Sequence, residues 1–83
     1  MKPEELLADA NLVELLRAYR AARTRHAQAQ REAPDDPDTA KLQRESLRAG
    51  NRAARHLIKS GAADTPVRAR QLMTQLIFRL PRE

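Results

Sequence analysis

Residues 34–37, Pro34-Asp35-Asp36-Pro37, decide the fold. Proline lacks a backbone N–H and its ring obstructs the preceding helical turn, so this stretch ends one helix and allows another to begin. On both sides of it, side chains suited to packing recur at spacings of three and four, which is the pattern of an amphipathic helix. Because so short a connection makes consecutive helices antiparallel, the sequence predicts a long helical hairpin.

The two arms of the hairpin are expected to be helices over about residues 11–33 and 38–60. Asp36 or Asp38 can cap the second arm, and Gly61 can end it because glycine readily adopts the left-handed conformation. The packing row predicted for the first arm is Leu12, Leu15, Tyr19, Ala22, His26, Ala29 and Ala33. The row predicted for the second arm is Ala40, Gln43, Leu47, Gly50, Ala54, Leu57 and Gly61. Residues 3–8 can form a separate short helix or extend the first arm.

A third helix is expected over about residues 66–80, after a turn at 61–65, with Thr65 as its cap and Pro66 in its first turn. Its broad apolar face consists of Ala69, Leu72, Met73, Leu76, Ile77 and Leu80. We expect this face to pack on the leucine-rich end of the hairpin and to leave an alanine-lined arm projecting. The predicted fold class is therefore all-α: a long antiparallel hairpin plus a C-terminal amphipathic helix, forming a three-helix bundle in one domain over residues 1–83.

Composition excludes several classes of protein. The 83 residues contain no cysteine, so disulfides and thiolate metal sites are absent. Acidic residues stand where a signal peptide would be apolar, and no apolar run reaches membrane-spanning length. We therefore expect a cytoplasmic protein that does not enter the membrane.

The positive charge is concentrated on one face of the second arm. The chain carries a net charge of +5, and 13 of its 16 basic residues are arginine, the side chain best suited to bidentate contact with phosphate or carboxylate. At 100° per residue, six basic side chains fall within an arc of about 80°. We call these six the basic stripe: Lys41, Arg44, Arg48, Arg52, Arg55 and Lys59. Three arginines near one flank of the first arm can widen this positive surface: Arg17, Arg20 and Arg31.

The stripe has two interpretations. It can be the ordinary solvated face of a helix, or it can bind a polyanion. Glu45 is the only acid at its edge, whereas solvated helix faces usually mix charges of both signs. Single-stranded nucleic acid is disfavoured because the only aromatics are Tyr19 and Phe78, and a helix-turn-helix is disfavoured because it would bury Glu45, Asn51 and Lys59. A nucleic-acid duplex backbone or an acidic protein surface remains.

No catalytic or metal-binding arrangement is predicted. His26 and His56 have no cysteine or carboxylate at metal-ligand spacing, and neither Ser46 nor Ser60 has an arranged base. We interpret Asp35, Asp36 and Asp38 as turn and capping residues. The expectation is a protein that is not an enzyme, with no cofactor, no metal and no small-molecule substrate.

Val67 and Phe78 fall opposite the main apolar face of the third helix, on the side expected to meet water. A chain so short of core can bury such residues against a partner, so both are predicted interface residues and a homodimer is expected. The preferred function is a non-enzymatic binding or regulatory module that contacts a polyanion, chiefly a nucleic-acid backbone. The alternative is a self-associating helical adaptor, chaperone or inhibitor that binds another protein.

Overall fold

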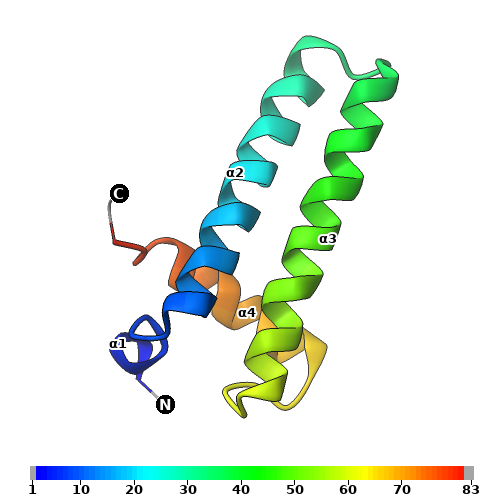
Figure 1. Ribbon diagram of the computed structural model, residues 1–83. Helices are drawn as coiled ribbons and strands as arrows, with labels where there is room; N and C mark the ends of the chain where they lie inside the picture. Colours follow the sequence, from blue (N-terminus) through cyan, green and yellow to red (C-terminus); the bar gives the residue numbers. More distant parts are fainter. Residues whose placement is uncertain (1, 82–83) are drawn as a thin grey trace.

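The computed structural model describes residues 2–81, which form a helical hairpin crossed at its base by a further helix. Its helices are α1 (Pro3–Leu6), α2 (Ala10–Glu32), α3 (Pro37–Lys59) and α4 (Pro66–Ile77). Helices α2 and α3 run side by side, and α4 crosses both at the end opposite their connecting turn (Figure 1). No strand occurs within residues 2–81, so the predicted all-α fold class is confirmed. None of the described helices combines the length and apolar character needed to cross a bilayer.

Capping residues fix the helix ends close to the predicted positions. The Asp36 carboxylate accepts a hydrogen bond from the Asp38 N–H at 2.9 Å, and the Thr65 hydroxyl accepts one from the Arg68 N–H at 3.1 Å. Gly61 has φ of 85°, and the N–H of the following residue, Ala62, donates to the Leu57 carbonyl at 3.0 Å. This is the glycine-dependent termination predicted for the second arm.

Two helix ends were not predicted correctly from the sequence: one was left undecided, and the other was placed too late in the chain. Residues 3–6 form a separate helix, because Asp9 leaves helical geometry to cap α2. Helix α4 ends at Ile77 rather than near residue 80. Proline disfavours helical geometry in the residue before it, so Pro81 helps to end the helix early, and residues 78–80 follow as a tight turn.

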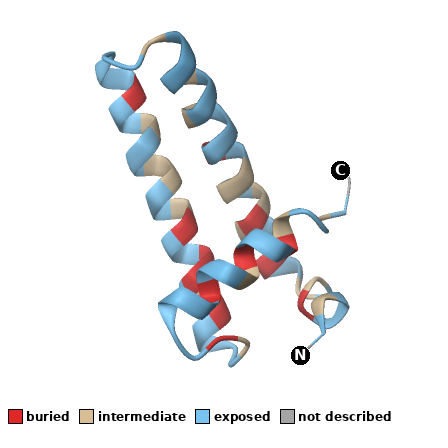
Figure 2. Cartoon of the chain, turned by 180° about the vertical axis from the view of Figure 1, so that it is seen from behind, coloured by how far each residue is buried: buried red, intermediate tan, exposed pale blue. Residues whose placement is uncertain are grey.

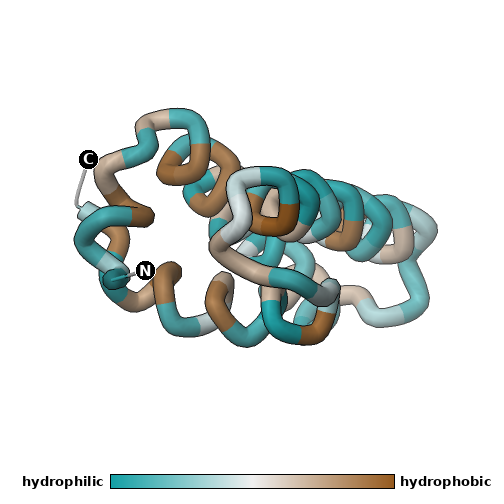
Figure 3. Tube along the Cα trace, turned by 90° about the horizontal axis from the view of Figure 1, so that it is seen from below, coloured by the Kyte–Doolittle hydropathy of each residue, from teal (hydrophilic) through white to brown (hydrophobic). Residues whose placement is uncertain are grey.

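The core lies where α4 crosses the hairpin. Leu16 and Leu57 are fully buried there, and Met73 and Leu76 of α4 are 1% exposed. Buried residues gather at this base in Figure 2, whereas the arm above it is mostly exposed or half-buried. In Figure 3 hydrophobic stretches alternate with hydrophilic ones along the chain, as expected for helices with one packed face. The predicted arrangement of a leucine-rich base and a slim arm is confirmed.

The packing row predicted for α3 is correct near the base and wrong toward the turn. Thr39 is buried and Leu42 and Ser46 are half-buried, each one position before the predicted Ala40, Gln43 and Leu47, which are exposed. The Thr39 hydroxyl donates to the Ala33 carbonyl at 2.6 Å, and this hydrogen bond sets the rotation of α3 at the turn.

Gly50 of α3 faces the ring of Tyr19 on α2 at close range. A Cβ atom at this position would lie 3.0 Å from Cε1 of Tyr19, so only glycine fits without displacing the ring. From Gly50 to Leu57 the predicted row is buried, because here the ring of Tyr19 and the leucines of the base fill the space between the helices. Toward the turn, the packed face of α3 passes through Ser46, Leu42 and Thr39, so Leu47 lies outside it and remains 52% exposed.

Candidate polyanion-binding surface

The structure places the basic stripe on the side of α3 turned away from α2. All six of its side chains are exposed. On a regular helix their arc lies roughly opposite the packed row through Thr39, Gly50 and Leu57. The stripe is straight and spans about 27 Å, since 18 residues of α-helix separate Lys41 from Lys59 at 1.5 Å each. Between these ends no residue within the arc is apolar.

The charges of the stripe are not neutralised by any side chain that the structure describes. Within residues 2–81, none of its six side chains forms a salt bridge or a hydrogen bond. Glu45, at the edge of the arc, is half-buried and forms no ion pair with Lys41 or Arg48. The described part of the chain therefore carries a row of six unpaired cations at one face.

Arg70 of α4 joins this surface although the sequence did not single it out. Its guanidinium donates to the Asn51 side-chain carbonyl at 2.8 Å. Asn51 lies one helical turn from both Arg48 and Arg55, so Arg70 is held at the flank of the stripe. Only the crossing of α4 over α3 brings these residues together, and the spacing within α3 carries no signal of it.

The three flanking arginines have surroundings of their own on α2. Arg17 is half-buried at the base, where its guanidinium donates to the Pro81 carbonyl at 3.0 Å. Arg20 lines a pocket beside Phe78, and Arg31 lines another beside Ser46. The structure therefore places these three cations along α2 rather than beside the basic stripe, which is on the far side of α3.

A hydrogen bond between Asp9 and His56 lies beside the base end of the stripe. His56 Nε2 donates to Asp9 Oδ2 at 2.7 Å, while Asp9 Oδ1 accepts from the N–H groups of Asn11 at 3.0 Å and Leu12 at 3.3 Å. The hydrogen bond from His56, followed by that from the Leu12 N–H, lowers the pKa of Asp9 below its ordinary value of 3.8. One carboxylate thus caps α2 and links it to α3. The sequence pattern carries no signal of this pair, because 47 residues separate its members.

Replacing Asp9 with asparagine should lower stability at neutral pH but not in strong acid. The lowered pKa means that the folded state holds the ionised carboxylate more strongly than the unfolded state does, so the contribution exists above about pH 4 and disappears as pH falls through the folded-state pKa. Asparagine can still cap the helix, so the change isolates the charge. Thermal melts followed by circular dichroism should show a lower Tm for Asp9→Asn at pH 7 and a gap that closes near pH 2.

Asp64 provides the matched control for this charge removal. It is exposed, and its side chain forms no hydrogen bond in the part of the chain that the structure describes. Asp64→Asn should therefore have the same Tm as the unmodified protein at both pH values. An Asp9→Asn gap that persists unchanged in acid would show that the hydrogen bond with His56 contributes nothing through its charge.

The two predicted interface residues are both exposed but lie apart. Val67 is 69% exposed and Phe78 is 86% exposed. They lie at opposite ends of α4, about 16 Å apart along its axis, with polar residues between them. They therefore form two separate apolar positions rather than one patch.

The described residues contain no cluster of metal-ligating side chains. Within residues 2–81 no group of three or more His, Cys, Asp or Glu side chains is placed to hold a metal ion. His26 lines a shallow pocket with Tyr19 and Ser46, without a carboxylate. The row of unpaired cations on α3 is the arrangement best suited to binding a ligand, because it can bind anions. Comparisons with models of protein families, with curated proteins and with solved structures find no match to this chain.

Proposed function

We propose that this protein binds the phosphate backbone of duplex nucleic acid through the basic stripe of α3, extended by Arg70. The observation that carries the proposal is the straight row of six exposed cations, none of which forms an ion pair within residues 2–81. Phosphates close to such a row replace water and mobile counterions as the partners of the guanidinium groups, and the counterions released from the nucleic acid favour binding. The protein is a non-enzymatic binding or regulatory module in this account.

The chemistry of the stripe favours a phosphate backbone over other anionic partners. Protein interfaces depend on buried apolar or aromatic anchors, and none lies within the arc of the stripe. Single strands are bound by stacking of bases on aromatic side chains, which the stripe also lacks. A straight row of about 27 Å matches the axial length of roughly eight base pairs at 3.4 Å of rise each. Binding should therefore depend weakly on base sequence.

Titration of labelled duplexes tests this proposal directly. Random-sequence DNA and RNA duplexes of about 20 base pairs should bind at about 50 mM salt, while a single strand of equal length should bind more weakly. Fluorescence anisotropy measures both. The absence of binding to either duplex would overturn the proposal.

Self-association stays a separate prediction. Val67 and Phe78 are available for it because both are exposed, and the arm has few buried residues above the base. A homodimer would align two basic stripes on one assembly, but the proposed contact with a phosphate backbone does not require it.

A further inference from the structure

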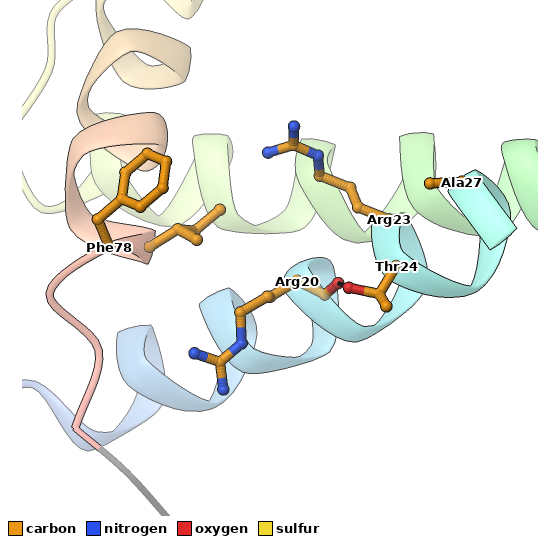
Figure 4. A pocket seen from close by; sticks show the side chains of 6 residues that line it. Arg20, Arg23, Thr24, Ala27 and Phe78 are labelled. Atoms are coloured by element: carbon orange, nitrogen blue, oxygen red, sulfur yellow. Dashed lines mark hydrogen bonds between the residues drawn. The ribbon is translucent and has the colours of Figure 1, made fainter.

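A groove formed by α2 and the end of α4, and not by the helix that carries the stripe, combines an exposed aromatic ring with arginines. Its lining comes from the end of α4 and the middle of α2: Arg20, Arg23, Thr24, Ala27, Ile77 and Phe78. We call it the Phe78 groove; its volume is about 550 Å³. In Figure 4 the Phe78 ring lies at one end and Ala27 at the other, with the Arg23 guanidinium between them and Arg20 along α2.

The groove continues along α2 toward the turn. A second pocket shares Arg23 and Ala27 with it and extends to Arg31 and Ser46. From Arg20 to Arg31 the two cover about 16 Å of helix, the length of about three turns of a bound helical segment. Small side chains at Thr24 and Ala27 leave room for such a segment against α2.

The charge of this groove is positive throughout. Among the described residues, arginines line both pockets and no aspartate or glutamate lines either. Arg20 forms no side-chain hydrogen bond or ion pair in residues 2–81, and the guanidinium of Arg23 stacks over the Tyr19 ring with 5.3 Å from its Cζ to the ring centroid. Stacking leaves the N–H groups at the edge of the Arg23 guanidinium available to carboxylates.

The surface area of the chain also points to a partner. The protein exposes 5982 Å², whereas a compact monomer of 9.4 kDa exposes about 5000 Å². The excess of about 1000 Å² is similar to the roughly 800 Å² that one protein contributes to an interface of standard size. The residues of the arm are mostly exposed or half-buried (Figure 2), and the groove is lined in part by the α2 residues of that arm.

We propose that the Phe78 groove binds an acidic amphipathic helix of another protein. An apolar side chain of that helix packs on Phe78 and Ala27, and carboxylates at its flanks pair with Arg20 and Arg23. The groove differs from the basic stripe because it offers an apolar anchor beside its cations, the combination typical of protein interfaces. Two copies of the groove placed face to face would instead bring their arginines together, and such juxtaposition of like charges is unfavourable.

Two matched peptides test this assignment. One is a 12-residue helical peptide with leucine and phenylalanine at i and i+4, flanked by four glutamates; the other has glutamines in place of the glutamates. Anisotropy at about 150 mM salt, where exposed charges are screened beyond about 8 Å, should show micromolar binding of the acidic peptide and at least tenfold weaker binding of the other. Backbone amide shifts in NMR spectra should change along residues 20–31 and at 77–78.

Variants separate this site from the stripe. Phe78→Ala should weaken binding of the acidic peptide at least about tenfold, as expected for a central anchor. The fold should be retained, because the Phe78 ring is exposed. Val67→Ala, the same kind of change at the other exposed position of α4, should leave affinity within about twofold. Glutamine at Arg48, Arg52 and Arg55 should also leave the affinity for the peptide within about twofold. The test of the groove is therefore independent of nucleic-acid binding by the stripe.

Four outcomes would overturn the proposal. Equal affinity for the two peptides, or no binding of either peptide, would show that the groove does not recognise carboxylates. If the variant with glutamine at Arg48, Arg52 and Arg55 lost peptide binding while Phe78→Ala kept it, the peptide-binding site would be the basic stripe on α3. Sedimentation that shows a dimer, abolished by Phe78→Ala, would assign the groove to a second copy of this chain.

Discussion

Replacement of Arg48, Arg52 and Arg55 by glutamine is expected to weaken binding to duplex nucleic acid by on the order of 100-fold or more at about 0.1 M salt. Each phosphate contact changes the slope of log K against log salt by about 0.9, so three lost contacts are worth more than two orders of magnitude at this concentration. The three side chains are exposed and unpaired within residues 2–81, so helicity and Tm should be retained. Anisotropy titrations and circular dichroism measure the two effects.

A control of equal charge separates the stripe from net charge. Arg25, Arg68 and Arg79 are exposed and lie outside the stripe on α2 and at the two ends of α4. Glutamine at these three positions lowers the net charge by the same amount, yet should weaken binding by less than about tenfold, because only diffuse attraction is lost. Equal losses in the two triple variants would assign binding to overall charge rather than to the row on α3.

Leu57→Ala is expected to destabilise the protein by about 2–5 kcal/mol, whereas Leu47→Ala should cost less than about 1 kcal/mol. Both changes remove the same atoms from the same helix, ten residues apart. Leu57 is fully buried at the base, and its truncation leaves a cavity among the leucines of the core, whereas Leu47 is 52% exposed. Thermal melts should show that Leu57→Ala lowers the Tm by roughly 8–40 °C, given 4–8 °C per kcal/mol in a chain of this size.

This comparison also decides between two rotations of α3. If the row predicted from sequence continued toward the turn, Leu47 would be packed and its truncation would cost as much as that of Leu57. Similar losses in the two variants would therefore contradict the arrangement in which Thr39, Leu42 and Ser46 face α2.

The elements of the fold could be predicted because local chemistry determines them. Two prolines fix the turn, Gly61 and Thr65 mark helix ends, and spacings of three and four identify the packed faces. The rotation of α3 toward the turn could not be predicted, because it depends on the hydrogen bond from Thr39 to Ala33. An apolar side chain such as Leu47 is normally predicted to be buried. Its exposure follows from how α2 and α3 pack against each other, which the sequence of α3 alone does not show.

The candidate sites divide in the same way. The basic stripe lies within one helix, so spacing alone placed its six side chains on one exposed face. The contributions of Arg70, Asp9 and the Phe78 groove arise between helices that are distant in sequence. Phe78 was singled out as exposed from its position on the third helix, but the arginines beside it became apparent only once α4 was placed against α2.

The salt dependence of duplex binding tests the central claim most directly. A backbone contact made by the stripe predicts a straight line of log K against log salt with a slope steeper than about −3, since each neutralised phosphate contributes about −0.9. The slope should become shallower by about 2–3 when Arg48, Arg52 and Arg55 are replaced by glutamine. A slope near zero, or one that the triple replacement leaves unchanged, would contradict binding through the basic stripe.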